Sequence, residues 1–250
     1  MIQIKNNEQL ALMRKAGRIT GEAILKGREH VKEGVSTKEI DTVIHDYIVK
    51  CGATPSFLGY GGFPGSACVS VNNEIIHGIP KKDRILHEGD IVKIDVGACY
   101  RGFHGDSANT FGVGKISPEA QALIDATRES FFRGVAFARN GNRIGDIGSA
   151  VSAYAESLGY GVVRQYVGHG VGHELHEDPE VPNYGTAGRG QRLYTGMTIA
   201  IEPMINMGTR EVRVLRDNWT VVTADGSLSA HYEHTVAITD GEPVLFTKVE

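Results

Sequence analysis

The sequence lacks both the long apolar runs of a membrane protein and the paired cysteines of a disulfide-rich one. No stretch approaches the roughly 20 apolar residues that a transmembrane helix needs, and the N-terminal segment has no apolar centre like that of a signal peptide. Three cysteines, Cys51, Cys68 and Cys99, show no C-x-x-C spacing, so neither a disulfide framework nor a cysteine zinc site is supported. We therefore expect a protein of the reducing cytoplasm without a membrane partner.

A strong excess of one charge is also missing. The 26 basic and 30 acidic residues give a net charge of −4, and no block of like charge stands out. This balance argues against broad nucleic-acid binding. Hydrophobic residues make up 41% of the 250 residues, which is enough for a substantial core. The 32 glycines are scattered, which indicates many tight turns rather than a disordered linker.

Two halves of the sequence resemble each other at a constant offset of 107 residues. "LHEGDIVKIDVGA" from Leu86 and "LYTGMTIAIEPMI" from Leu193 share the pattern L-x-x-G-x-x-[VI]-x-I-[DE]. Further upstream, "EGVSTKEIDTVIHDYI" from Glu33 corresponds to "NGNRIGDIGSAVSAYA" from Asn140. Two copies of one unit, each with helices followed by strands, are the economical interpretation. The repeat predicts a single α+β domain of residues 1–250, with halves of about 1–115 and 116–250 related by a pseudo-two-fold axis.

Helical periodicity and capping residues place four helices in this scheme. They are predicted over residues 8–33, 36–51, 118–138 and 145–158, with N-caps near Thr37 and Ser117. Short alternating segments predict strands over much of the remainder. In each half the helices would therefore cover one face of a mostly antiparallel sheet.

Acidic residues interrupt the predicted strands where buried residues are due. An apolar strand from Ile91 runs into Asp95, and Asp106 follows eleven residues later. A hairpin with Tyr100 and Arg101 at its tip would set the two carboxylates opposite each other, with Cβ atoms about 5 Å apart, which is destabilising unless compensated. A shared proton, a nearby arginine or a shared cation could compensate.

Two further acids repeat this anomaly. Glu202 in "TIAIEPMI" corresponds to Asp95 at the 107-residue offset, and Glu233 stands within "HYEHTVAI". Each carboxylate alone could cap a turn or pair with an arginine. Four of them in or beside apolar strands would need protons or cations to be tolerated.

Histidines in a glycine-rich segment add nitrogen ligands. "GHGVGHELHEDPEVPNYG" contains His169, His173 and His176, and its glycines disfavour the helix that a zincin H-E-x-x-H motif needs. Such histidines could equally make surface or core hydrogen bonds. One imidazole joined to four carboxylates suits two divalent ions such as Mn, Fe, Co or Zn. Two such ions activate water and polarise a carbonyl, so hydrolysis is the predicted chemistry.

The motifs "KIDVGACYRGFHGD", "GHGVGHELHEDPEVPNY", "AIEPMI" and "HYEHTVAI" resemble, in order and spacing, the metal-ligand motifs of methionine aminopeptidases. The resemblance extends over essentially the whole chain. It implies the pita-bread fold, with helices covering a curved, mostly antiparallel sheet, and two divalent metals (Co, Mn, Fe or Zn). The ligands that it implies are Asp95, Asp106, His169, Glu202 and Glu233, of which Asp106 and Glu233 would bridge.

The resemblance also implies an activity and catalytic roles. The enzyme would remove the N-terminal methionine from nascent proteins and peptides, preferring a small second residue, by hydrolysis with water activated between the two metals. His77 would lie near the scissile amide nitrogen, although by itself it reads as a turn residue, and His176 would stabilise the oxyanion. Glu202 would carry a proton from water to the leaving amine. His173 matches no ligand of the family.

A cluster of apolar and aromatic residues is the predicted methionine pocket. Without the resemblance this segment would read as a loop with core anchors. Phe57 and Phe63 stand where some members of the family have cysteine and tyrosine, and Leu175 stands where others have phenylalanine, which puts the fine shape of the pocket in doubt. The substrate-binding residues implied by the resemblance are Phe57, Tyr60, Phe63, Cys68, His77, Leu175, His176 and Trp219.

Other expectations concern partners and alternatives. The chain looks like the compact bacterial type I form, without the N-terminal extension or helical insertion of other types, and we expect a monomer. Arg210, Arg213 and Arg216 lie in a segment that resembles the family's ribosome-docking loop, or they form a solvated hairpin edge. The competing functions are an X-Pro peptidase of the same fold and a binding module without metals.

Overall fold

Two helix pairs frame the fold in the computed structural model of this chain, which describes residues 2–249. The helices are α1 Asn7–Arg28, α2 Thr37–Lys50, α3 Pro118–Val135 and α4 Ile144–Ser157, with a short 3-10 helix, η1, at Tyr60–Gly62. The bounds of α2 and α4 keep the 107-residue offset of the sequence repeat at both ends. No helix within residues 2–249 is both long enough and apolar enough to span a bilayer.

Serine caps begin two of the helices. The Ser36 hydroxyl accepts a hydrogen bond from the Glu39 N–H at 3.2 Å, so Ser36 rather than Thr37 is the N-cap of α2. Ser117 caps α3 in the same way, as predicted. Both α1 and α3 end before the predicted residues 33 and 138. After each helix the hydrogen bonds tighten, and the N–H groups of residues 30, 31, 137 and 138 bond to carbonyls three residues back.

Antiparallel pairing joins the strands, as the sequence predicted. All strand pairs among residues 2–249 are antiparallel. The strands are β1 Thr54–Pro55, β2 Ala67–Val71, β3 Glu74–Ile76, β4 Ile91–Tyr100, β5 Phe103–Gly112, β6 Gly161–Val162, β7 Gly168–Gly170, β8 Glu177–Val181, β9 Thr198–Ile201, β10 Met204–Asn206, β11 Val212–Val214, β12 Val221–Thr223, β13 Ser229–His231, β14 His234–Ala237 and β15 Val244–Leu245.

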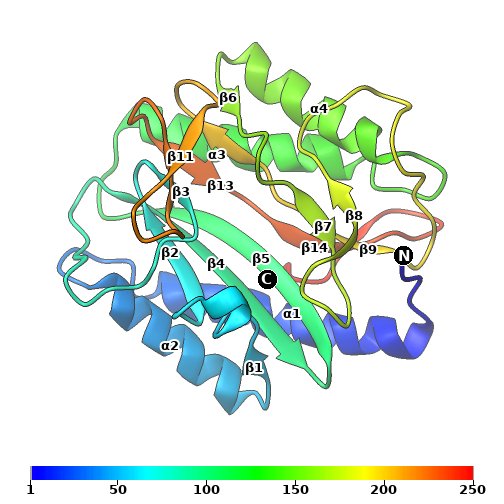
Figure 1. Cartoon of the computed structure of the whole chain (residues 1–250), viewed down its shortest axis with the longest axis horizontal. Coiled ribbons are helices and arrows are strands. Elements are labelled where there is room, and N and C mark those ends of the chain that lie inside the picture. The colour runs from blue at the N-terminus through cyan, green and yellow to red at the C-terminus, as the bar shows by residue number, and fades with distance from the viewer. Residues whose placement is uncertain (1, 250) are drawn as a thin grey trace.

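The same three-strand unit occurs in each half. β4 pairs with β2 and β5 in the first half, and β9 pairs with β7 and β14 in the second. In Figure 1, α1 and α2 lie along one side of the strands and α3 and α4 along the other. Two smaller sheets, β13-β10-β6 and β11-β12-β3, complete the layer between the helices. This arrangement agrees with the α+β class and the repeat predicted from the sequence.

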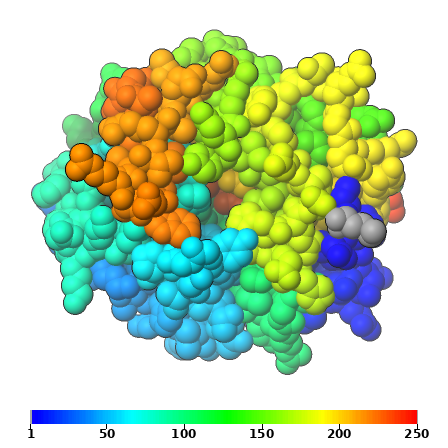
Figure 2. Space-filling model, in the orientation of Figure 1, coloured from blue at the N-terminus to red at the C-terminus, as the bar shows by residue number. Residues whose placement is uncertain are grey.

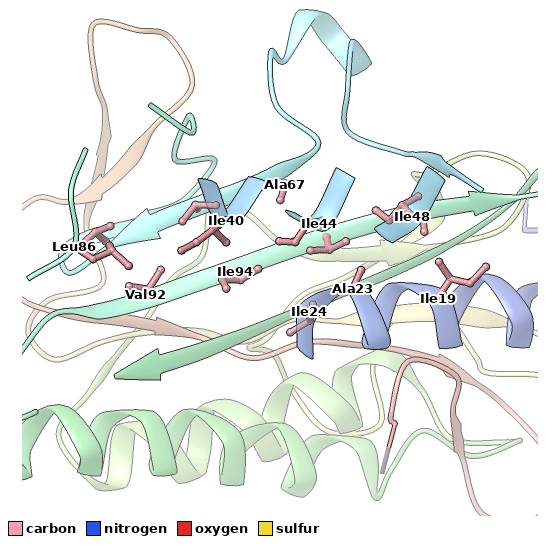
Figure 3. Packing of buried hydrophobic residues seen from close by; sticks show 14 of the residues in the cluster. Ile19, Ala23, Ile24, Ile40, Ile44, Ile48, Ala67, Leu86, Val92 and Ile94 are labelled. Carbon is pink, nitrogen blue, oxygen red and sulfur yellow. The ribbon is translucent and has the colours of Figure 1, made fainter. Parts of the chain in front are cut away.

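The first core lies between the N-terminal helices and β4. Ile40, Ile44 and Ile48 recur at four-residue spacing and form one apolar stripe of α2. Figure 3 shows this stripe, together with residues of α1, packed against Val92 and Ile94 of β4. Because these helices cover one face of β4, Asp95 is left to face the opposite side of the sheet.

The β4–β5 hairpin differs in register from the prediction. Arg101 and Gly102 form its two-residue turn, both with positive φ (50° and 78°), which matches the primed turns that suit hairpins. Asp106 therefore pairs with Gly97 and Asp95 with Ala108, so the predicted tip at 100–101 and the direct Asp95–Asp106 opposition are wrong. Each residue of β4 therefore pairs two residues further along β5 than predicted. An even shift keeps both carboxylates on one face as diagonal neighbours, where their repulsion is weaker than between directly opposed charges.

Threonine hydroxyls join the two halves where β5 meets β13 and β14, a contact that we call the seam. The Thr235 hydroxyl accepts from the Asp106 N–H at 2.9 Å and donates to the Asp106 carbonyl at 2.8 Å. The Thr110 hydroxyl binds the N–H and the carbonyl of His231 in the same manner, at 2.9 and 2.8 Å. The seam therefore places Asp106, from the first half, beside Glu233, which lies between β13 and β14.

The seam can be tested by a nearly isosteric substitution. Thr235→Val removes both hydrogen bonds to the Asp106 backbone and leaves a buried N–H and a buried carbonyl unpaired. Each unpaired group costs about 1–3 kcal/mol, so we expect the free energy of unfolding to fall by about 2 kcal/mol or more. Urea denaturation of the metal-free protein measures this loss.

Thr127→Val is the control for this experiment. Thr127 is also buried, but its hydroxyl bonds only to the Leu123 carbonyl within α3. That carbonyl keeps its helical partner in the variant, so a loss below about 1 kcal/mol is expected. Equal losses in the two variants would contradict a special contribution of the seam.

Candidate metal centre and substrate cavity

One face of the molecule is hollowed by a cavity of about 330 Å³. Figure 2 shows the hollow between cyan, yellow-green and orange segments of the chain, with red atoms in its depth. The cavity wall contains each site residue predicted from the sequence: Phe57, Tyr60, Phe63, Cys68, His77, Asp95, Asp106, His169, Leu175, His176, Glu202, Trp219 and Glu233. The prediction did not include five further lining residues: Gly61, Ile76, Gln165, Tyr166 and Val167.

Both halves of the chain contribute carboxylates to the cavity. Asp95 comes from β4 and Asp106 from β5, on the common face of that hairpin. His169 is the middle residue of β7, Glu202 follows β9 directly, and Glu233 lies between β13 and β14. Because the seam joins β5 to β14, residues from both halves of the chain meet in the wall of one cavity.

The ligand atoms form two overlapping groups. Atoms of Asp106, His169 and Glu233 lie within 4.8 Å of one another, and so do atoms of Asp95, His231 and Glu233. The His169 Nε2 is 3.5 Å from a Glu202 oxygen and 3.7 Å from an Asp106 oxygen. These separations are long for hydrogen bonds, whereas two atoms that each bind one metal at about 2.0–2.2 Å commonly lie this far apart.

The buried carboxylates lack partners that would neutralise them. Among residues 2–249, Asp95 Oδ1, Asp106 Oδ1 and Glu233 Oε1 have no hydrogen-bond partner. The ion pairs of the described chain bring histidines, and no lysine or arginine, to the acidic cluster. The arginine alternative is therefore not realised, and the orphaned oxygens fit divalent cations.

Burial also changes the proton affinity of these groups. It raises the pKa of Asp106 to about 7. Burial first, and then repulsion from neighbouring carboxylates, holds the pKa values of Asp95, Glu202 and Glu233 well above the usual range. Without cations the cluster would therefore retain protons, and binding of cations must release them.

His169 is oriented as a nitrogen ligand. Its Nδ1 lies 2.8 Å from the Gly170 carbonyl, which can only accept, so Nδ1 carries the proton and the Nε2 lone pair is free. Nε2 faces Asp106 and Glu202. Burial lowers the pKa of His169 to about 3, with a further contribution from His176, so the imidazole is neutral at pH 7.

His77 occupies a strained position in the cavity wall. It follows β3 with φ 57°, in the left-handed region that non-glycine residues seldom adopt and that is enriched at functional sites. Its ring lies edge-on to Tyr166 and Trp219, with centroids 5.7 and 6.2 Å away. Burial lowers the pKa of His77 to about 4, so its ring is neutral at pH 7.

His176 lies beside the centre and is exposed. Its ring centroid is 4.1 Å from that of His169, and its Nδ1 is 2.9 Å from the Tyr60 hydroxyl. Desolvation, and then the neighbouring His104, lowers the pKa of His176. His173, by contrast, does not line the cavity: it is exposed, with its Nδ1 2.9 Å from the Gly102 carbonyl.

Apolar groups form the rest of the cavity wall. The rings of Phe63 and Trp219 meet edge to face at 5.1 Å. Cys68 and Leu175 are buried, and burial raises the pKa of the Cys68 thiol well above its usual value, so it remains a neutral apolar group. Tyr166, which the sequence prediction missed, completes this wall. An unbranched, polarisable side chain suits such a pocket.

His231 is the most informative residue that the sequence prediction missed. Its side chain is 1% exposed, and neither ring nitrogen has a hydrogen-bond partner among the described residues. Its Nε2 is 3.8 Å from a Glu233 oxygen and 4.0 Å from a Glu202 oxygen. The available signal was its position two residues before Glu233, since alternate residues of an extended segment share a face.

The raised pKa of Asp106 predicts a pH-dependent stability of the metal-free protein. An aspartate in the unfolded chain titrates near 3.9, so between about pH 4 and 7 the folded protein holds a proton that the unfolded chain has released. The free energy of unfolding contributed by this group therefore falls as pH rises through that window. We expect Asp106→Asn to be more stable than the unchanged protein at pH 7 and similar at pH 4.

Denaturation curves of the metal-free proteins at several pH values measure this difference. Each unit of pKa shift corresponds to about 1.4 kcal/mol, so the gain at pH 7 should be on the order of a few kcal/mol. Asp83→Asn, at an exposed position, is the matched control and should follow the unchanged protein. Parallel curves for Asp106→Asn and the unchanged protein from pH 4 to 7 would contradict the expectation.

Comparisons with known proteins identify the family of this chain. Residues 11–240 match metallopeptidase family M24. A methionine aminopeptidase of Clostridium acetobutylicum is 55% identical over 250 residues, covering 100% of both chains. The crystal structure of methionine aminopeptidase from Thermotoga maritima superposes with a TM-score of 0.98, at 43% identity and over 100% of both chains.

The same fold also occurs in a solved structure of lower sequence identity. Prolidase from Pyrococcus furiosus superposes with a TM-score of 0.80 at 27% identity, over 99% of this chain but 66% of the prolidase. The two superpositions confirm the pita-bread fold predicted from the sequence.

Proposed function

The chain belongs to metallopeptidase family M24, and we propose that it is a methionine aminopeptidase that removes the N-terminal methionine from peptides and nascent proteins. The observation that carries this proposal is the junction of an apolar, sulfur-containing pocket with a cluster of four carboxylates and an imidazole in one cavity. The pocket takes the methionine side chain, and the cluster takes the metal ions. The set of carboxylates and imidazole accepts Co, Mn, Fe or Zn.

The proposed metal ligands are the five residues predicted from the sequence. Bound divalent ions lower the pKa of water and polarise the scissile carbonyl. Glu233 would be shared between two ions, since it belongs to both groups of close ligand atoms, and the resemblance implies that Asp106 is shared as well. Asp95 belongs to one group and His169 to the other.

Three residues carry the proposed proton transfers and hydrogen bonds. Glu202 accepts a proton from the attacking water and delivers it to the leaving amine, a role that suits a carboxylate whose pKa is raised by burial. His77 faces the scissile nitrogen. His176, neutral and held at 2.9 Å by the Tyr60 hydroxyl, donates to the oxyanion that develops on the carbonyl oxygen.

The pocket accounts for selection of methionine. Phe63, Trp219 and Leu175 provide apolar contact, and the neutral Cys68 thiol adds a polarisable surface next to the thioether. A substrate held with its first carbonyl against the carboxylate cluster must fit the backbone of its second residue close to the metal ions. A small second residue is therefore preferred.

Peptide hydrolysis tests this proposal. We expect release of free methionine from Met-Ala peptides, slower release from Met-Leu peptides, and no hydrolysis of Ala-Pro. A chelator should reduce the release to background, and Co²⁺ or Mn²⁺ should restore it, because the carboxylates need the ions to act on water.

Two outcomes would overturn the assignment. Hydrolysis of Ala-Pro without release from Met-Ala would favour the X-Pro alternative, which the likeness to prolidase brings into consideration. Methionine release that persists after full removal of metal would contradict the metal centre. Glu211→Gln, at an exposed carboxylate outside the cavity, should behave as the unchanged enzyme.

The proposed function also suggests the oligomeric state, the location and a ribosome contact of the enzyme. It acts as one catalytic domain and as a monomer in the cytoplasm, where its free cysteines remain reduced. The exposed Arg210, Arg213 and Arg216, on and around β11, would bring it to the ribosome, where nascent N-termini emerge.

Ribosome docking is tested by removing these charges together. Replacing Arg210, Arg213 and Arg216 with alanine should reduce co-sedimentation with ribosomes, because binding to the phosphate backbone depends on basic side chains. Hydrolysis of short peptides should be unaffected, since none of the three lines the cavity. Unchanged co-sedimentation would contradict docking through this loop. The control variant replaces three exposed arginines on other parts of the surface: Arg18, Arg133 and Arg139.

A further inference from the structure

We propose that His231 is a sixth metal ligand, which adds an imidazole to the ion held by Asp95 and Glu233. The proposal rests on the proposed dimetal site and extends it, because the five ligands implied by the sequence give this ion only carboxylates. With His231, each of the two ligand groups contains one histidine and shares Glu233: His169 on one side and His231 on the other.

The distances around His231 match those around His169. His231 Nε2 lies 3.8 Å from a Glu233 oxygen and 4.0 Å from a Glu202 oxygen, while His169 Nε2 lies 3.7 and 3.5 Å from its two carboxylate oxygens. One atom of each of Asp95, His231 and Glu233 falls within a single 4.8 Å group. Such spacing is too wide for hydrogen bonds and fits atoms arranged around one ion.

The His231 ring is buried without a hydrogen-bond partner, which favours a bound cation. His231 is 1% exposed, and buried polar atoms in native proteins nearly always have a partner. Both of its ring nitrogens lack one among the described residues. His234, also buried and three residues further on, bonds Thr247 through Nδ1 and Tyr232 through Nε2. The unpartnered ring is thus peculiar to the histidine that faces the carboxylates.

The seam fixes the backbone of His231 but not its ring. The Thr110 hydroxyl binds both the N–H and the carbonyl of His231, so the residue cannot move away from the cluster without breaking two buried hydrogen bonds. Its Nδ1, however, has no counterpart of the Gly170 carbonyl that orients His169. Because such supporting bonds are commonly worth 10–100-fold in metal affinity, His231 should be the weaker and more adjustable of the two nitrogen ligands.

A nitrogen ligand at this position changes which ion the site prefers. Carboxylate-only sites suit Mg and Mn, whereas imidazole favours Fe, Co, Ni and Zn. His231 should therefore strengthen Co²⁺ binding at the Asp95 side more than Mn²⁺ binding. Removing it should leave a dimetal site whose second ion is bound through oxygen.

Metal titration of the metal-free enzyme tests the proposal. Calorimetry with Co²⁺ should show two binding steps in the unchanged protein, and His231→Gln should weaken one of them by about tenfold or more. The same titration with Mn²⁺ should change by less than about threefold, because oxygen ligands suffice for that ion. The visible absorption of the Co²⁺-loaded protein should also shift, since loss of a nitrogen ligand alters the ligand field.

His234→Gln serves as the matched control. It removes a buried histidine from the same strand region, one that the hydrogen bonds of Thr247 and Tyr232 account for. Both Co²⁺ steps and the absorption bands should persist in this variant. Identical Co²⁺ affinities and spectra for His231→Gln and the unchanged protein would overturn the proposal. Absence of Co²⁺ binding by the unchanged protein would instead overturn the proposed dimetal site itself.

Thermal melting of His231→Gln with a chelator present shows whether the variant folds. If it does not fold, a measurement on the unchanged protein tests the proposal instead. In Co²⁺-loaded protein with ¹⁵N-labelled histidine, ring nitrogens bonded to the ion carry a far larger shift than those of neighbouring histidines such as His176, so only that size of shift is counted. Two such histidines, one for each ligand group, are expected. A single shifted histidine would show that only His169 binds and would overturn the proposal.

Discussion

Threonine hydroxyls in the seam hold the two halves together beside the carboxylates of the cavity. β5 belongs to one sheet and β13 and β14 to two others, so no regular ladder sets their spacing. The Glu233 N–H donates directly to the Ala108 carbonyl across this contact. Thr235 and Thr110 add to that bond, each binding both the N–H and the carbonyl of one residue across the contact. Because Asp106 and His231 are those residues, the hydrogen bonds that join the halves also set the positions of side chains that we propose as metal ligands.

The buried carboxylate cluster destabilises the metal-free fold, and bound cations would relieve that destabilisation. Burial without lysine or arginine raises the pKa of these acids, so the metal-free protein must either keep protons or tolerate uncompensated charge. Divalent ions remove that cost, and any ligand that binds only the folded state stabilises it. Stability and activity are therefore linked through the same atoms. The left-handed backbone of His77, in the wall of the same cavity, is a second local source of strain.

Much of the fold and of the candidate site could be predicted from local signals. Periodicity and caps placed the helices, and the apolar strands interrupted by acids marked Asp95, Asp106, Glu202 and Glu233. The hairpin register was wrong by one pair because positive φ at Arg101 as well as Gly102 moved the turn by one residue. The face that the two aspartates share survived the error, since a whole-pair shift preserves side-chain direction.

The sequence by itself determined the residue types, the 107-residue repeat and, through motif resemblance, the family, and it predicted a set of metal ligands. It could do so because periodicity, spacing and motif order are local or linear properties of the chain. Only the tertiary structure decided which side chains share the cavity with those ligands. Tyr166 and His231 carry no distinctive local pattern, and His231 stands among the carboxylates only because the seam docks one half against the other. The packing of segments more than 100 residues apart determines such neighbours, and no short stretch of sequence encodes it.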